Sequence, residues 1–245
     1  MNLCIDIGNS FIKIAIFEHK NLVLFQERLD YQDITKICET YPIHKIMVCD
    51  VANKIEPLLS HISTHIPKNI SIQKLNFQTQ LPITNLYETP QTLGMDRLAA
   101  VLGAYSLFRG QNCMIIDAGS CITYDFLSAT GVYYGGSISL GLAMRFRALH
   151  EFTAKLPLLS PSNALEITQI GKTTEEAMQS GVIHGFLYEI DAIIANFTNK
   201  YANDTQKNQV LICGGDADFL HKRLKSKTQV LPTLLLNGLN ELIHN

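Results

Sequence analysis

Two short segments of the sequence place an aspartate, a glycine and a serine hydroxyl in the same order. They read Asp-Ile-Gly-Asn-Ser at residues 6–10 and Asp-Ala-Gly-Ser at residues 117–120. The glycine lets the backbone approach a ligand closely, and successive backbone N–H groups together with the serine hydroxyl can bind an anion such as phosphate. One such segment alone is better explained as an ordinary β-hairpin. Two of them facing each other across a cleft would hold a polyphosphate and its metal ions from both sides.

A third segment combines an acidic and a basic side chain at the expected start of a helix. It reads Asn-Leu-Tyr-Glu-Thr-Pro-Gln-Thr-Leu-Gly-Met-Asp-Arg at residues 85–97, directly before the apolar run 98–102. Because the proline disfavours helix just before it, we expect the helix to begin near Gly94. The first backbone amides and Arg97 would then favour anions, and Asp96 could project into a cleft. The simpler alternative is that this aspartate only satisfies the helix end.

The elements that must carry these segments follow from the hydrophobic pattern. The apolar run 3–5 ends at the first aspartate, and isoleucines then alternate with other residues over 12–16, which is the period of a strand. The same order recurs at 113–116 and 121–127, so the chain contains two copies of one unit. Further elements are predicted as strands at 22–29, 45–51, 132–138 and 209–213, and as helices at 31–41, 53–66, 93–108, 141–155, 174–199 and 234–244. This alternation predicts an α/β protein with mixed sheets flanked by helices, divided near Gly110.

The composition narrows the class of protein. Of the 245 residues 47% are hydrophobic and 17% charged, which is enough apolar material for buried cores. A net charge of −2 without a basic stripe argues against nucleic acid as a partner. No apolar run approaches a membrane span, and the N-terminal residues do not read as a secretory signal. The six cysteines show no metal-ligand spacing. We therefore expect a cytoplasmic protein with no membrane partner.

The motifs together resemble those of type III pantothenate kinase. Besides the three segments above, the chain carries Gly-Gly-Ser-Ile-Ser-Leu-Gly at 135–141 and Ile-Cys-Gly-Gly-Asp at 212–216. All five segments lie in the family's order and cover essentially the whole chain. Each is weak alone, but the combination is specific.

This resemblance implies a member of the superfamily of acetate kinases, sugar kinases, Hsp70 and actin. The fold would be two ribonuclease-H-like (actin-like ATPase) domains, residues 1–110 and 111–245, with the active site in the cleft between them. The implied reaction converts ATP and pantothenate to ADP and 4′-phosphopantothenate, the first step toward coenzyme A. Such enzymes are cytoplasmic homodimers that need a monovalent cation, potassium or ammonium, besides the magnesium that accompanies ATP.

The resemblance also implies residue roles. Asp96 would be the general base that faces the pantothenate hydroxyl, and Asp117 would bind the monovalent cation. The ATP-binding residues would be Asp6, Ile7, Gly8, Asn9, Ser10, Phe11, Ile12, Lys13 and Ser120. The pantothenate-binding residues would be Tyr87, Gly94, Met95, Asp96, Arg97 and Thr174. Thr173 is the alternative to Thr174, since one residue of slip in the match is open. The reading requires the carboxylates of residues 6, 96 and 117 to converge in one crevice.

The sequence departs from the family pattern at four positions. Ser10 and Ser120 stand where threonine is usual, so each hydroxyl is kept. Leu140 replaces a usual proline, which puts the stiffness of that loop in doubt, and Cys213 replaces a common threonine. Two other functions stay open: a non-catalytic regulatory protein on the same scaffold, resembling the Bvg accessory factor, or a kinase for another small alcohol.

Overall fold

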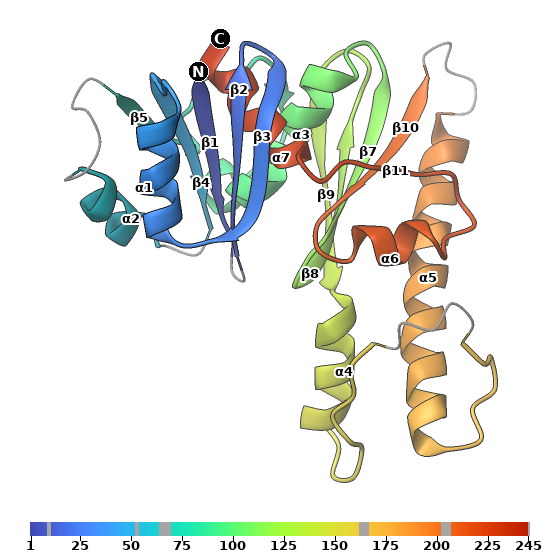
Figure 1. Ribbon diagram of the computed structural model, residues 1–245. Coiled ribbons are helices and arrows are strands. Elements are labelled where there is room, and N and C mark those ends of the chain that lie inside the picture. The colour runs from blue at the N-terminus through green and yellow to red at the C-terminus, as the bar shows by residue number, and fades with distance from the viewer. Residues whose placement is uncertain (9–10, 52–53, 64–69, 162–166, 202–206, 245) are drawn as a thin grey trace. The chain divides into compact units, whose positions relative to one another are not determined.

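The computed structural model describes residues 1–8, 11–51, 54–63, 70–161, 167–201 and 207–244. They form two mixed sheets flanked by helices (Figure 1). The chain groups into two compact units: Met1–Gly110, Leu127–Gly135 and Thr233–Asn245 make the first, and Gln111–Phe126 and Gly136–Pro232 make the second. The division into domains 1–110 and 111–245 stays a prediction.

The first sheet belongs to the first unit and has the strand order β3-β2-β1-β4-β5. Strand β1 pairs antiparallel with β2 and parallel with β4. The strand bounds are β1 (Asn2–Ile7), β2 (Ile12–Glu18), β3 (Asn21–Leu29), β4 (Lys45–Asp50) and β5 (Ser71–Lys74).

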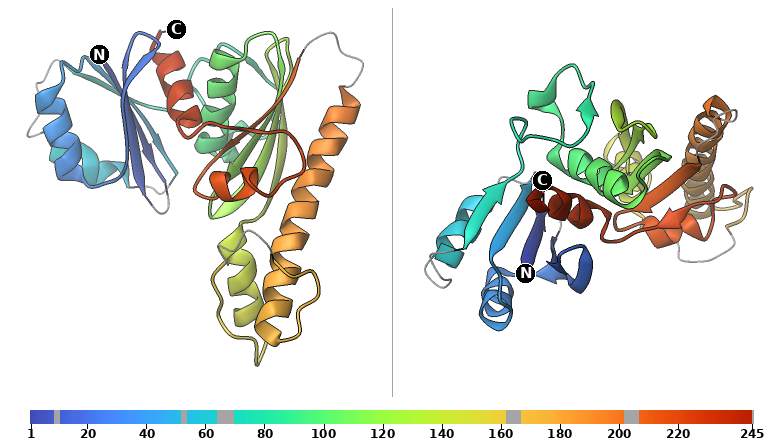
Figure 2. Two further views of the ribbon diagram at one scale, coloured as in Figure 1. Left: turned by 45° about the vertical axis from the view of Figure 1, so that its right-hand side comes forward. Right: turned by 90° about the horizontal axis from the view of Figure 1, so that it is seen from above.

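Helices cover both faces of the first sheet (Figure 2). Leu3, Ile5 and Ile7 point to one face and join a core with residues of α1 and α2. Asn2 points to the opposite face, where its amide donates to Oδ1 of Asn240 in α7 at 2.9 Å. The helices of this unit are α1 (Tyr31–Thr40), α2 (Ile55–Ser63), the 3₁₀ turn η1 (Pro90–Thr92), α3 (Met95–Leu107) and α7 (Leu234–His244).

The second sheet has the strand order β11-β10-β7-β8-β9-β6. Strand β10 is parallel to both β7 and β11, and the short β6 is parallel to β9. The strand bounds are β6 (Thr84–Asn85), β7 (Asn112–Ala118), β8 (Cys121–Leu127), β9 (Val132–Leu140), β10 (Asn208–Cys213) and β11 (Gln229–Val230).

The second unit has its core between this sheet and the long helix α5. Met114 and Ile116 of β7 pack in one apolar cluster with Phe186 and Ile190 of α5. Helix α4 and the N-terminal half of α5 run side by side beyond the ends of the strands (Figure 2). The helices of the second unit are α4 (Leu142–Glu151), α5 (Thr174–Lys200) and α6 (Ala217–His221).

The predicted elements are confirmed wherever the structure describes them, with shifts of a few residues at their ends. Residues 64–66, predicted as the end of the second helix, lie outside the described residues. Three short strands, β5, β6 and β11, were not predicted. Within the described residues no helix is both long and apolar enough to cross a membrane.

Candidate active site

The first Asp-x-Gly segment is held by the β1–β2 hairpin. Asp6 lies near the end of β1, directly opposite Lys13 of β2 in the antiparallel register. The backbone N–H of Gly8 donates to the carbonyl oxygen of Phe11 at 3.1 Å and closes the turn. The predicted ATP-binding residues Asn9 and Ser10 lie outside the described residues.

Asp96 lies in the first turn of α3, and Gly94 is the residue that caps this helix. Oδ1 of Asp96 accepts a hydrogen bond from the backbone N–H of Arg97 at 2.8 Å, so the aspartate side chain does satisfy part of the helix end. A Cβ on residue 94 would lie 2.5 Å from the same oxygen. A side chain at position 94 would therefore have to displace the Asp96 carboxylate.

The negative charges of Asp6 and Asp96 act on the same buried residue of the first unit. Strand alternation puts Asp6 on the face of the sheet that α3 and α7 cover, and Cys49 of β4 is its neighbour in the parallel register. Burial raises the pKa of the Cys49 thiol well above its ordinary value, and the negative charges of Asp6 and Asp96 raise it further. Two acidic groups from distant parts of the chain thus act on one buried thiol.

Arg97 and Tyr87 make a second contact beside Asp96. Arg97 is only 5% exposed, and its guanidinium lies 5.6 Å from the centre of the Tyr87 ring. That ring stacks on Tyr133 with 6.4 Å between centroids and 6° between planes. Gly135 has φ +89°, and a Cβ there would lie 3.2 Å from Tyr87. The tyrosine is therefore held on more than one side.

Asp117 occupies the matching place in the second unit, near the end of β7. Gly214 follows the neighbouring strand β10 with φ +91°, and a Cβ there would lie 2.5 Å from both Oδ1 of Asp117 and the carbonyl oxygen of Ala118. That carbonyl accepts the backbone N–H of Asp216 at 3.0 Å, and burial raises the pKa of the Asp216 carboxyl. The carboxylate and carbonyl oxygens are the donors that hard cations prefer.

Ser120 and Thr174 fall on exposed positions. Ser120 lies at the tip of the β7–β8 hairpin and is exposed. Thr174 is the first residue of α5, whereas the hydroxyl of Thr173 accepts the backbone N–H of Glu176 at 3.2 Å and caps that helix. The choice between Thr173 and Thr174 as the substrate contact stays a prediction.

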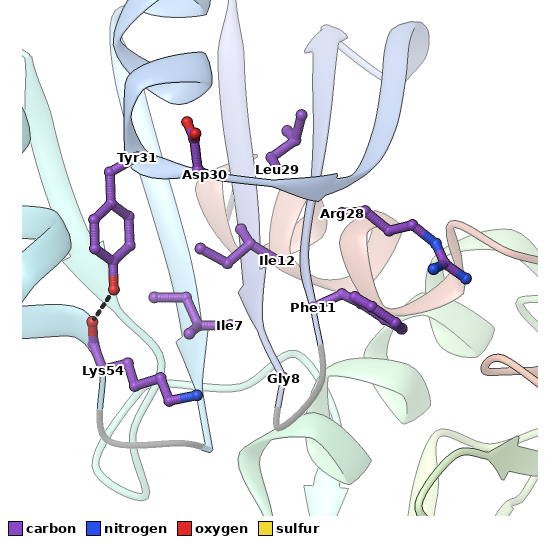
Figure 3. Close-up of a pocket in the computed structure, with 9 residues that line it drawn as sticks. All are labelled: Ile7, Gly8, Phe11, Ile12, Arg28, Leu29, Asp30, Tyr31 and Lys54. Atoms are coloured by element: carbon purple, nitrogen blue, oxygen red, sulfur yellow. Dashed lines mark hydrogen bonds between the residues drawn. The ribbon is translucent and has the colours of Figure 1, made fainter.

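An open pocket of about 390 Å³ lies against the first hairpin (Figure 3). Four predicted ATP-binding residues line it: Ile7, Gly8, Phe11 and Ile12. The other lining residues come from the end of β3, the start of α1 and the residue before α2: Arg28, Leu29, Asp30, Tyr31 and Lys54. Because Ile7 and Asp6 are adjacent in a strand, their side chains point to opposite faces. The pocket therefore lies on the α1 side of the first sheet. Neither Asp6 nor Asp96 lines it.

The three predicted carboxylates are divided between the two units. Asp6 and Asp96 share the first unit, while Asp117 belongs to the second, so the convergence of all three stays a prediction. Among the described residues, no three His, Cys, Asp or Glu side chains form a group that could hold a metal ion. Tyr133 and Gly135, which fix Tyr87, were not among the predicted site residues.

Known proteins resemble this chain along its whole length. The family model for type III pantothenate kinase matches residues 2–196. A Bacteroides fragilis protein named type III pantothenate kinase is 39% identical over 246 aligned residues, covering 100% of this chain and 98% of that protein. A Phocaeicola vulgatus protein of the same name is 41% identical, covering 99% and 98%.

Solved structures resemble the chain in fold. A Campylobacter jejuni protein provisionally described as a Baf family transcriptional activator has a TM-score of 0.63 at 20% identity, covering 99% of this chain and 97% of that one. A glucokinase from an Antarctic psychrotroph has a TM-score of 0.52 at 12% identity, covering 100% and 98%. These likenesses confirm the actin-like and sugar-kinase fold class and concern the fold alone. Together with the family model and the relatives at 39–41% identity, they lead to one conclusion: the chain belongs to the type III pantothenate kinase family.

Proposed function

We propose that this protein transfers the γ-phosphoryl group of ATP to the primary hydroxyl of pantothenate. The products are ADP and 4′-phosphopantothenate, and the reaction is the first step of coenzyme A synthesis. Membership of the family supports the reaction. The observation that carries the assignment of the site is the placement of the two carboxylates: Asp6 lies near the end of β1 beside Cys49, and Asp96 lies in the first turn of α3. The charges of both raise the pKa of the Cys49 thiol.

Asp96 acts as the general base in this proposal. Phosphoryl transfer through a loose transition state requires mainly positioning and charge neutralisation, and the attacking hydroxyl loses its proton late. A carboxylate at the start of a helix can orient that hydroxyl and accept the proton as the new bond forms. The hydrogen bond from the backbone N–H of Arg97 to Oδ1 holds the Asp96 carboxylate in a defined place.

Pantothenate is held by the residues around that base. The molecule carries a carboxylate and carbonyl oxygens, which a guanidinium such as that of Arg97 can bind through paired hydrogen bonds. Tyr87 shares a contact with Arg97, so the two side chains form one surface beside Asp96. Gly94, Met95 and Thr174 complete the proposed substrate contacts.

The triphosphate contacts both Asp-x-Gly segments in this proposal. Asp6, Lys13 and the hairpin that joins them contribute from the first segment, and Ser120 contributes from the second. Magnesium, bound mainly by the phosphates with one or two carboxylates, would neutralise the negative charge that develops on them. Asp117 and the carbonyl oxygen of Ala118 suit a potassium or ammonium ion, because both are hard oxygen donors.

The assembly and location follow the family pattern in this proposal. We propose a homodimer, because large apolar side chains such as Phe152 (85% exposed) and Ile170 (80% exposed) lie uncovered in the single chain. Multi-angle light scattering gives the mass directly, and a monomer at micromolar concentration would contradict the dimer. We propose a cytoplasmic location, because the reaction consumes ATP.

The test is ADP release by the purified protein in magnesium and potassium, with and without pantothenate. We expect release that depends on pantothenate, and 4′-phosphopantothenate as the product by mass spectrometry. Release stimulated by a different small alcohol, but not by pantothenate, would assign a kinase of another substrate. If no alcohol stimulates release although an ATP analogue binds, the protein has a non-catalytic role.

A further inference from the structure

Arg145 of α4 joins three elements of the second unit through its guanidinium. Its Nε donates to the carbonyl oxygen of Leu140 at 2.9 Å, and a terminal nitrogen donates to Oγ of Ser139 at 3.2 Å. The same nitrogen pairs with Oε2 of Glu189 in α5 at 2.6 Å. The end of β9, the first turns of α4 and the middle of α5 are thus fixed to one side chain, which is 18% exposed.

Glu189 is itself held by a second partner. Its Oε1 accepts the hydroxyl of Tyr124, a fully buried residue of β8, at 3.1 Å. Burial raises the pKa of that hydroxyl and the charge of Glu189 raises it further, so Tyr124 remains a donor. The guanidinium also lies 4.6 Å from the centre of the Phe186 ring. Arg145 therefore has one well-defined position.

The backbone that Arg145 binds touches the predicted nucleotide hairpin. Gly141 directly follows Leu140, and a Cβ on it would overlap the carbonyl oxygens of Gly119 and Ser120. Its φ of −66° is ordinary, so the glycine is required by this close approach and not by its conformation. Any displacement of residues 139–141 would consequently displace the hairpin that carries Asp117 and Ser120.

We propose that Arg145 is a positioning residue for nucleotide binding, acting through residues 139–141 on the hairpin 117–120. Leu140 lacks the ring that would restrict its backbone, and the hydrogen bond from Arg145 supplies that restraint. The expected effect of Arg145 on the KM for ATP rests on the proposed kinase reaction. Its expected effect on nucleotide binding does not.

The first experiment compares Arg145→Met with a matched control on the same helix. Arg147 is exposed and pairs with Glu151 on the same helix, so Arg147→Met removes an arginine without touching the loop. We expect Arg145→Met to raise the KM for ATP about tenfold, the size expected for losing a charge-assisted hydrogen bond. The KM for pantothenate stays within twofold, and Arg147→Met leaves both values unchanged. An unchanged KM for ATP in Arg145→Met overturns the proposal.

A second pair of variants separates positioning from stability. Arg145→Met leaves the Glu189 carboxylate without its cation, and Arg145→Met/Glu189→Gln removes that charge. We expect the double variant to recover thermal stability but not nucleotide affinity. Recovery of both would overturn the proposal, because the defect would then be the uncompensated charge. Should Arg145→Met fail to fold, Arg145→Lys decides instead: its single ammonium cannot reproduce the fork, and wild-type affinity would overturn the proposal.

Calorimetric binding of a non-hydrolysable ATP analogue keeps this test independent of turnover. We expect the dissociation constant to rise about tenfold in Arg145→Met and not in Arg147→Met. If the wild-type protein binds the analogue but does not phosphorylate pantothenate, the proposed function fails and this comparison still stands. Equal affinity of wild type and Arg145→Met would reject the role of Arg145 alone.

Discussion

At the scale of single residues, the central group is the carboxylate of Asp96. Replacing it with asparagine keeps the size and the hydrogen bond from the Arg97 backbone but removes the proton acceptor. We expect kcat to fall about 10²–10⁴-fold while pantothenate still binds, as measured by steady-state kinetics and calorimetry. Glu88→Gln, an exposed carboxylate eight positions earlier, is the control and should leave kcat unchanged. Near-normal turnover in Asp96→Asn would refute the general base.

The same scale holds the prediction for the monovalent cation. Potassium should activate the enzyme strongly over sodium if Asp117 binds it. Gly214→Ala should raise the half-saturating potassium concentration, because its Cβ would meet Oδ1 of Asp117 and the backbone φ is +91°. Gly215→Ala is the matched control, since a Cβ there meets nothing within 4 Å. Equal rates in sodium and potassium would contradict the assignment of a monovalent cation to Asp117.

At this scale, sequence reasoning finds candidate residues where a local motif carries the chemistry. Asp6 and Asp96 follow recognisable turn and helix-start patterns, and the negative charges of both raise the pKa of the Cys49 thiol. Their roles in the reaction stay predictions. Sequence reasoning could not find Tyr133 or Arg145. Tyr133 contacts Tyr87, and Arg145 contacts Glu189. These partners are distant in the chain, so no local sequence pattern predicts the contacts.

At the scale of elements, α3 and α7 pack through glycines. A Cβ on Gly238 of α7 would overlap the carbonyl oxygen of Ala99 in α3, and one on Gly103 would overlap that of Leu234. Gly238→Ala should therefore lower the free energy of unfolding by about 1–3 kcal/mol in urea denaturation. Gly185→Ala in α5 has open space and should raise it by about 0.5–1 kcal/mol. Equal effects of the two would contradict close helix packing.

The same helix pair contains a buried acid. Burial would raise the pKa of the Glu241 carboxyl, but hydrogen bonds from Ser106 and Lys20, and the ion pair with Arg109, outweigh it and lower the pKa below its ordinary 4.5. A lowered carboxyl pKa adds stability above the ordinary value and loses it as the pH falls through the folded value.

Glu241→Gln tests that dependence. At pH 7 it should lower the free energy of unfolding by about 1–2 kcal/mol, the contribution of hydrogen bonds to a charged group. The difference from wild type should shrink as the pH falls below 4.5, because the carboxyl of the unfolded chain then takes up a proton. It should be lost once the pH falls below the lower pKa of the folded carboxyl. Chemical denaturation at several pH values measures it. A difference that is constant from pH 7 to pH 3 would show that the charge is irrelevant.

The elements that sequence reasoning missed are short ones. Strand β5 has the sequence Ser-Ile-Gln-Lys, in which only Ile72 is half-buried, so little hydrophobic alternation exists to detect. Strands β6 and β11 have two residues each. They are strands only because β9 and β10 lie beside them, and that neighbourhood is a property of the folded chain.

At the scale of the whole molecule, the first unit is built from three separate stretches of chain. Helix α7 buries Leu234, Leu236 and Leu239 and contacts β1 and β4. A chain ending after Pro232 should therefore fail to form this unit, with loss of the cooperative thermal transition in circular dichroism. Removal of Asn245 alone is the control. Sequence order groups residues 234–244 with the second half, and only the folded contacts group them with the first.

Translation order gives this feature a biological cost. The ribosome releases β1 early, but α7 emerges only after the entire second unit has been made. During synthesis the face of the first sheet that carries Cys4 and Cys49 lacks its cover and remains available to chaperones or to aggregation. Slow elongation near the 3′ end of the message would prolong that exposure, so codon choice there should influence the yield of active enzyme.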